Sequence, residues 1–328
     1  NNPFGKVSKF KTPRAYVPTP SPPPAQNGSS NSNNNNGSNQ ESPSTRAPSS
    51  GDSSTRSSTR LELPSWIKKK HAGKEGKIPL KQIPIKKHYT VADLTQIYGI
   101  KKQVLDMNSV NAATFVFDSS FEYSEGFKQL LSSIGKSISH VSSNEFCKIL
   151  IHLGAPQVMT QVAIDRWVEN HYRWIVWKLA CYERTMPEKF AQKKLTPDSV
   201  LTQLLYRYDR EYANGRRSAL RKICEKDELE SRYIILCVAA ILPSEDSDNK
   251  FAAIEVTDGW YSMRAMCDAA LSRLITSEKI LVGDKLKICN AKMNGNENGY
   301  HPLDVGTGVC LQLSCNSVRK AKWHAPLG

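Results

Sequence analysis

Residues 167–178 constrain the fold more than any other stretch, because they hold three of the six tryptophans of the chain. On a helical projection their apolar side chains cover most of the circumference and leave one narrow polar strip. That strip holds Arg166, Glu169, Asn170 and Arg173, and Trp177 falls inside it. A helix with so little polar perimeter cannot lie on a simple domain surface, so we predict a central helix over about residues 158–185, covered on several sides. Two interpretations stay open: a core helix, or a helix that also braces a neighbouring domain or bound partner through Trp177 and its arginines.

Residues 1–87 are predicted to form a disordered basic tail and linker. The first 60 or so are rich in Pro, Ser, Asn and Gly, a composition that cannot build a core. Residues 1–87 carry 15 Lys and Arg against 4 Asp and Glu, so most of the net charge of +14 lies there and would attract a polyanion. The hexamer Lys9–Arg14 is either a docking peptide or solvated tail. The basic run over 68–87 is a nuclear import signal, a phosphate-contacting approach or a plain linker.

Residues 88–229 are predicted to form a helical domain. Thr90 can cap a first helix that stops at Gly99, and Ser143 can cap another that ends at Gly154. Thr196 and Pro197 open a second long helix that runs to about residue 228, with Gly215 as a kink or break. Its basic positions are interleaved with acidic ones, which favours a solvated, salt-bridged face over a phosphate-contacting one. These basic positions are Arg207, Arg210, Arg216, Arg217, Arg221 and Lys222.

The sequence Gly135-Lys136-Ser137 resembles the end of a phosphate-binding loop. That loop needs a glycine five residues before Gly135, and Leu130 stands there. We therefore expect a helix C-terminus at Gly135 and no nucleotide site.

Residues 230–328 change to an extended pattern. Strands are predicted at 233–242, 251–256, 260–266, 281–289 and 309–315, with a helix at 268–275. Three strands, a helix and two strands is the order of the five-stranded Greek-key barrel called the OB-fold. The predicted fold class is therefore α+β: a mostly helical domain packed on a five-stranded OB-fold barrel and preceded by a disordered tail.

An OB-fold commonly binds single-stranded nucleic acid by stacking bases on aromatic rings in a basic groove. The tentative DNA-binding residues are Arg264, Lys285 and Lys287. Trp260 and Tyr261 must face opposite sides of their strand, so at most one can stack a base. The loop Ser244–Asp248 is acidic where a DNA clamp needs cations. We therefore favour a packing role for Trp260.

No catalytic, metal or cofactor site emerges from the sequence. The eight cysteines stand singly, no pair of histidines has metal-ligand spacing, and no nucleophile motif occurs. No apolar run approaches the ~18 residues that a membrane span needs. We expect a protein that is not an enzyme, carries no cofactor and has no membrane partner.

Several motifs closely resemble the type-2 breast-cancer susceptibility protein family. They are the tryptophan-rich run Trp167–Leu179, Leu-Leu-Tyr-Arg-Tyr-Asp at 204–209, Thr-Asp-Gly-Trp-Tyr at 257–261, residues 108–117 and Cys315–Arg319. The likeness covers roughly residues 88–328. It corresponds to the helical domain and the first OB-fold of that family's C-terminal DNA-binding region.

The resemblance implies part of a nuclear mediator of homologous recombination. It implies a small acidic partner of the deleted-in-split-hand/split-foot type, weak binding of single-stranded DNA, and a RecA-like recombinase that binds regions outside this sequence. The implied partner-binding positions are Trp174, Trp177, Lys178, Tyr206, Arg207, Asp258, Trp260 and Tyr261. The alternative is an autonomous single-stranded-DNA-binding OB-fold protein.

Overall fold

The computed structural model describes residue 63 and residues 65–72, 80–83, 89–155, 159–243, 252–306 and 308–328. The predictions for residues 1–62, for Lys9–Arg14 and for the acidic loop Ser244–Asp248 concern residues outside this range. Within it, no helix is both long and apolar enough to cross a membrane.

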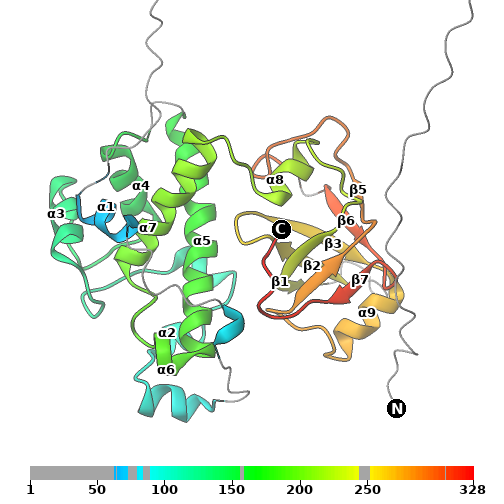
Figure 1. Ribbon diagram of the computed structural model, residues 1–328, viewed down its shortest axis with the longest axis horizontal. Coiled ribbons are helices and arrows are strands. Elements are labelled where there is room, and N and C mark those ends of the chain that lie inside the picture. Colours follow the sequence, from blue (N-terminus) through cyan, green and yellow to red (C-terminus); the bar gives the residue numbers. More distant parts are fainter. Residues whose placement is uncertain are drawn as a thin grey trace, which may run out of the picture. The chain divides into compact units, whose positions relative to one another are not determined.

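A series of mostly short helices precedes the sheet (Figure 1). The α-helices are α1 (Ser65–Ala72), α2 (Lys102–Leu105), α3 (Glu125–Ser133), α4 (Ser143–His152), α5 (Gln161–Thr185), α6 (Pro187–Phe190), α7 (Pro197–Tyr208) and α8 (Ala219–Cys224). Single turns of other types are η1 (Leu80–Gln82), η2 (Asp93–Ile97), η3 (Asn111–Thr114) and η5 (Asp209–Ala213). The predicted central helix is confirmed as α5.

The predicted helix caps are mostly confirmed. Thr196 accepts the Ser199 backbone N–H at 3.2 Å, with Pro197 in the first turn of α7. The cap of α4 lies one residue earlier than predicted, because Ser142 and Glu145 form a reciprocal capping box. Both pairs satisfy backbone N–H groups that the first turn leaves without an intrahelical partner.

Helix α1 lies inside the segment for which we expected a disordered tail and linker. Its Ile67 is fully buried in the same hydrophobic cluster as α5, and Trp66 packs against that cluster. This lysine-rich helix has only two large apolar side chains, Trp66 and Ile67, and they are adjacent, so the sequence shows no helical periodicity there.

The segment around Lys136 ends helix α3 as expected. Gly135 adopts a φ of 67°, its N–H bonds to the Ser132 carbonyl at 3.0 Å, and the Lys136 N–H bonds to the Leu131 carbonyl at 2.9 Å. This pair of bonds is a Schellman motif, which satisfies the last carbonyls of the helix. The backbone N–H groups that a phosphate cradle would need are therefore used within the helix end.

The prediction of one long helix over residues 196–228 is wrong. Helix α7 ends at Tyr208, the wider turn η5 follows, and α8 begins at Ala219 after a break at Gly215, whose φ is 60°. The break is where the sequence placed it, but it separates two helices instead of bending one.

Seven strands form one mixed sheet in the order β5-β6-β3-β2-β1-β4-β7. They are β1 (Ile234–Leu242), β2 (Ala253–Thr257), β3 (Ser262–Cys267), β4 (Lys285–Ile288), β5 (Lys292–Asn294), β6 (Cys310–Leu313) and β7 (Val318–Lys320), with α9 (Ala269–Thr276) between β3 and β4. All neighbours are antiparallel except β3 and β6. The five-stranded closed barrel is not confirmed: β5 and β7 are additional edge strands, and no pairing between them closes the sheet within the described residues.

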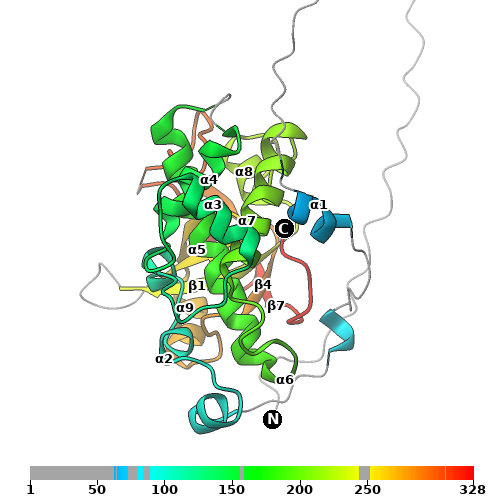
Figure 2. The ribbon, with the colours of Figure 1, turned by 90° about the vertical axis from the view of Figure 1, so that its left-hand side faces the viewer.

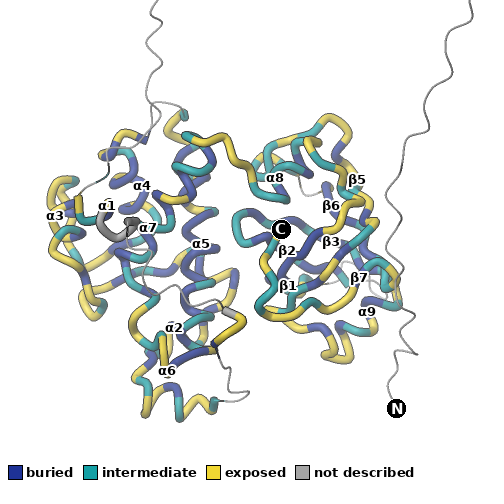
Figure 3. Tube along the Cα trace, viewed as in Figure 1, coloured by how far each residue is buried: buried dark blue, intermediate teal, exposed yellow. Residues whose placement is uncertain are grey.

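Two hydrophobic clusters organise these elements. One gathers the helices around α5 and includes Cys237 and Ala239 of β1. The other fills the inner side of the sheet and includes Leu220 of α8. In Figure 3 most of α5 is coloured as buried, in agreement with its many buried side chains. Since each cluster takes residues from the other part of the chain, the helices and the sheet share a junction.

Candidate functional site

The polar strip of α5 faces the sheet region. Arg173 pairs with Glu255 of β2 at 2.7 Å, and Asn170 donates its amide N–H to the Trp260 carbonyl at 2.8 Å. Arg166 pairs with Asp304 at 2.8 Å. The narrow polar strip that the sequence predicts on this helix therefore makes the contacts between the helices and the sheet.

A buried carboxylate, Glu211, lies at the centre of this junction. It accepts hydrogen bonds from Trp167 Nε1 at 2.8 Å, from the Tyr261 hydroxyl at 2.8 Å and from Arg221 at 2.5 Å. Burial alone would raise the pKa of Glu211, but the nearby His171 ring and the hydrogen bonds from Arg221 and Trp167 lower it to about 2. The carboxylate is therefore ionised at neutral pH and holds donors from three separate elements.

His171, next to Glu211, is neutral. Burial lowers the pKa of His171 to about 4. Arg207 donates to its Nδ1 at 2.9 Å, so the ring proton must be on Nε2, which lies 3.5 Å from Glu211. His171 therefore lies as a neutral ring between the cation of Arg207, to which it is hydrogen-bonded, and the anion of Glu211.

Arg207 reaches from α7 to the turn between β2 and β3. Its guanidinium donates to the Gly259 carbonyl at 2.8 Å and lies 5.1 Å from the centroid of the Trp260 ring. Burial lowers the pKa of Arg207 to about 10, so it still carries its charge at neutral pH. The packing role expected for Trp260 agrees with this geometry, since its ring lies against a helix residue.

Asp258 holds that turn in place. Its side chain accepts the backbone N–H groups of Trp260 and Tyr261, each at 2.9 Å, and of Leu220 in α8, also at 2.9 Å. One carboxylate therefore connects the strand turn to the first turn of a helix.

A cavity of about 360 Å³ opens beside this turn, and we call it the arginine pocket. It is lined by Tyr206, Arg210, Arg216, Arg217, Ser218, Ala219, Asp258, Trp260, Leu327 and Gly328. Arg210 donates to the Tyr206 hydroxyl at 2.8 Å, and Tyr206 is 46% exposed. Within the described residues no carboxylate pairs with Arg210 or Arg216, while Arg217 pairs with Glu225 and Asp227. The pocket combines unneutralised cations with aromatic rings, which suits an anionic partner.

The eight predicted partner-binding residues fall into two sets. Trp174, Trp177, Arg207, Asp258 and Tyr261 are buried. Tyr206 is exposed, and Trp260 and Lys178 are half-buried. Burial, with a smaller effect of the Arg207 charge, lowers the pKa of Lys178 to about 7, and its Nζ donates to Gln203. A partner on the surface could therefore touch Tyr206, Trp260 and Lys178, while the buried residues support them.

The three predicted DNA-binding residues do not lie together. Arg264 is on β3, separated in the sheet from β4 by β2 and β1. Lys285 and Lys287 are both on β4. The Lys285 Nζ is tied to the Ala325 carbonyl at 2.5 Å, whereas Lys287 is exposed.

Sequence reasoning missed Glu211, Arg210 and Arg216. It placed them on a solvated face of one long helix. In the structure Glu211 is buried in the junction, while Arg210 and Arg216 line the arginine pocket and stay accessible. Gly215 was the available signal, because a chain reversal there brings both helices against the same strand turn.

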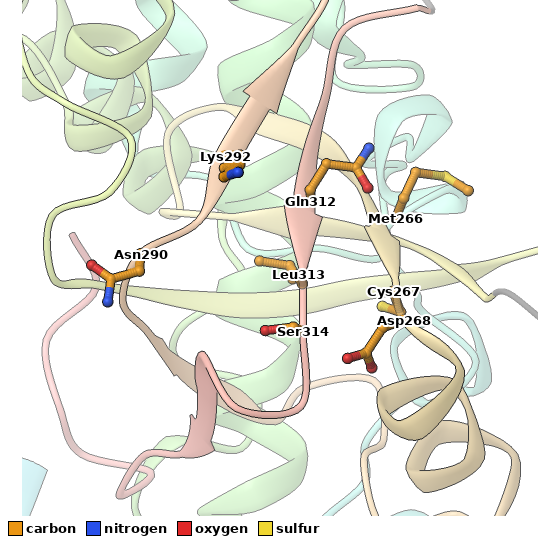
Figure 4. Close-up of a pocket in the computed structure, with 8 residues that line it drawn as sticks. All are labelled: Met266, Cys267, Asp268, Asn290, Lys292, Gln312, Leu313 and Ser314. Carbon is orange, nitrogen blue, oxygen red and sulfur yellow. The ribbon is translucent and has the colours of Figure 1, made fainter.

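A second cavity, of about 520 Å³, lies over β3, β5 and β6 (Figure 4). Its only carboxylate, Asp268, caps α9 through the Leu271 N–H and also accepts the Cys315 N–H. Lys292 is its single cation, so it offers less to a charged partner than the arginine pocket. No group of three metal-ligating side chains occurs in the part of the chain that the structure describes.

The fold and the junction define a class of protein: a two-part assembly in which a helical region and a mixed sheet share a buried polar network and an arginine-lined pocket. Comparison with protein families divides the chain in the same way. Residues 49–215 match the model described as "BRCA2, helical", and residues 218–328 match "BRCA2, oligonucleotide/oligosaccharide-binding, domain 1". The chain belongs to the BRCA2 family, and its sheet region is an OB-fold domain.

Two similar relatives are the proteins BREAST CANCER SUSCEPTIBILITY 2 homolog A and homolog B of Arabidopsis thaliana. Each is 34% identical over 249 residues, which cover 71% of this chain and 20% of the relative. The chain therefore spans about a fifth of the length of these relatives.

Proposed function

We propose that this chain is a non-enzymatic DNA-repair scaffold of a homologous-recombination mediator in the nucleus. Its helical part, residues 88–229, and its OB-fold, residues 230–328, together bind a small acidic protein and support single-stranded DNA binding. Recombinase loading then depends on regions outside this chain. The family membership supports the repair role.

The arginine pocket carries the proposal of an acidic partner. Arg210 and Arg216 have no carboxylate partner in the described part of the chain, and Tyr206 and Trp260 lie beside them. An acidic segment with an aromatic residue would gain charge-assisted hydrogen bonds there and would bury the exposed Tyr206 ring. The buried network of Glu211, His171 and Arg207 keeps the two walls of this pocket in register.

Co-expression with a small acidic protein of the deleted-in-split-hand/split-foot type tests this proposal. We expect a stable one-to-one complex on gel filtration, and we expect Arg210→Glu with Arg216→Glu to abolish it. The matched control is Lys102→Glu with Lys136→Glu, which changes the net charge equally at two exposed lysines of the helical region. Equal loss of the complex in both double variants would show that net charge, not the pocket, holds the partner.

The second candidate function is autonomous binding of single-stranded DNA by the OB-fold. The basic residues of β4 favour it, because Lys287 is exposed. Oligonucleotide affinity that is unchanged by the acidic partner, together with no stable complex, would favour this alternative.

A further inference from the structure

A basic surface with one aromatic ring lies where β4 meets β7. It adjoins the arginine pocket, because the N–H of Gly328, which lines that pocket, bonds to the Ile235 carbonyl of β1 at 2.9 Å. Lys287 of β4 stands directly opposite Arg319 of β7, and Ile235 of β1 stands opposite Lys287 on its other side. Tyr233 comes just before β1, and its ring lies on the same side as the Lys287 side chain, whose Nζ is 4.9 Å from the ring centroid. We call Lys287, Arg319 and Tyr233 the β4–β7 face (Figure 2 shows the two strands side by side).

The two cations of this face have no anionic partner in the described structure. Arg319 donates only to the backbone carbonyls of Cys315 at 2.9 Å and of Val318 at 2.7 Å. No ion pair joins Lys287 to a carboxylate among the described residues, and both side chains are exposed. Like charges directly opposite each other in an antiparallel pair destabilise a sheet. An anion that bridges them would remove that repulsion.

The aromatic ring of the face is open to solvent. Tyr233 is 47% exposed, although the Lys287 Nζ lies 4.9 Å from its ring centroid. An exposed ring that already lies beside a cation is suited to stack a nucleobase whose phosphate meets that cation. Lys285 is not part of this face, because its Nζ is bound to the Ala325 carbonyl.

The outer side of β1 and β2 is occupied by the helical region. Ser109 donates its hydroxyl to the Ala239 carbonyl of β1 at 2.8 Å, and Arg173 pairs with Glu255 of β2. A single strand could therefore not lie across these strands without displacing the helices. Among the described residues, no hydrogen bond or ion pair joins a helix to Lys287, Arg319 or Tyr233.

We propose that single-stranded nucleic acid crosses the β4–β7 face, with its phosphates on Lys287 and Arg319 and a base stacked on Tyr233. This inference rests on the DNA-binding part of the proposed function and names the surface that performs it. An acidic peptide would meet the two cations, but it offers a partner to the ring only where it also carries an aromatic residue. A nucleotide supplies the phosphate and the base together.

Fluorescence anisotropy with a labelled oligothymidylate of about 15 nucleotides tests the proposal on the whole chain. Lys287→Glu with Arg319→Glu should weaken binding about tenfold, and should reduce the slope of log affinity against log salt by roughly 1.4, as expected for two lost phosphate contacts. Lys102→Glu with Lys136→Glu is again the matched control, and should bind as the unchanged chain does. Equal affinity of the two double variants would overturn the proposed surface while leaving DNA binding by the chain intact.

Substitution of Tyr233 separates stacking from charge. Tyr233→Leu should lower the affinity for the oligonucleotide about tenfold and leave the salt slope unchanged. Tyr233→Phe, which keeps the aromatic ring, should keep the affinity of the unchanged chain. No detectable binding by the unchanged chain would overturn both this proposal and the DNA-binding part of the proposed function.

Labelled polyglutamate, an acidic peptide without bases, provides the last comparison. One contrary result is that the unchanged chain binds polyglutamate, while the double variant Lys287→Glu, Arg319→Glu no longer binds it but still binds oligothymidylate. In that case the face binds an acidic protein and the proposal is wrong.

Discussion

At the scale of single residues, Glu211 is the most consequential side chain in the junction. Its carboxylate accepts hydrogen bonds from Trp167 of α5, from Tyr261 just before β3 and from Arg221 of α8. Such a buried anion is costly to alter, because its partners lose their acceptor and stay desolvated.

We predict that Glu211→Gln lowers the free energy of unfolding by about 3 kcal/mol. The substitution keeps the shape of the side chain but removes the charge that Arg221 faces. Urea denaturation measures the change, with exposed Glu122→Gln as the control. If Glu211→Gln lowers the free energy of unfolding no more than Glu122→Gln does, the hydrogen bonds of Glu211 contribute little to stability.

The pH dependence of stability should report on His171. Its folded pKa is about 4, below the ordinary value of 6.5, so between these values the unfolded chain binds more protons. The free energy of unfolding should therefore fall as the pH falls from 6.5 toward 4, by about 3 kcal/mol from this residue. Glu211 adds a further loss only below pH 4.5, the ordinary value of its pKa.

Denaturation midpoints measured between pH 7 and pH 5 check this prediction. Burial also lowers the pKa of His301, and it lowers that of Lys178 to about 7, so the comparison with His171→Gln isolates the part that comes from His171. His171→Gln should flatten the profile in that window even if it lowers stability at pH 7. A profile with the same slope as that of the unchanged chain would contradict the assignment of the neutral ring.

At the scale of elements, the turn between β2 and β3 depends on Asp258. We predict that Asp258→Ala lowers the free energy of unfolding by about 3 kcal/mol, because three backbone N–H groups lose a charged acceptor. Asp304→Ala is the control, since Asp304 forms an exposed ion pair with Arg166 worth about 1 kcal/mol at most. Thermal or urea unfolding of both variants gives the comparison.

The long and strongly patterned elements could be predicted from the sequence. Helix α5 and strand β1 are long enough for their apolar pattern to decide the structure, and the cap at Thr196 follows from local hydrogen bonding. The three-residue strands β5 and β7 could not be predicted, because so short a segment shows no period and pairs only where its neighbour offers an edge.

The junction could be predicted only in part. The narrow polar strip of α5 indicated that this helix is covered on several sides, but it did not indicate which residues cover it. Glu211, which is buried, was assigned to solvent because one helix was expected where the chain makes two, whereas Arg216 is exposed as expected. Tertiary contacts between segments far apart in sequence decided their positions, and a single sequence does not display such contacts.

At the scale of the whole molecule, the helices and the OB-fold are linked by buried polar groups as well as by apolar packing. Residues of α5, α7 and α8 all bond to the turn between β2 and β3. We expect the two regions to unfold together, because neither can satisfy the buried charges of Glu211 and Arg207 alone. The arginine pocket then has walls that stay in place when a partner binds.

Hydrogen exchange with and without the small acidic protein tests the central claim most directly. If the arginine pocket binds that partner, amides in residues 206–219 and 258–260 should become protected in the complex, and Arg210→Glu with Arg216→Glu should remove this protection. Protection confined to segments away from the pocket would contradict the claim.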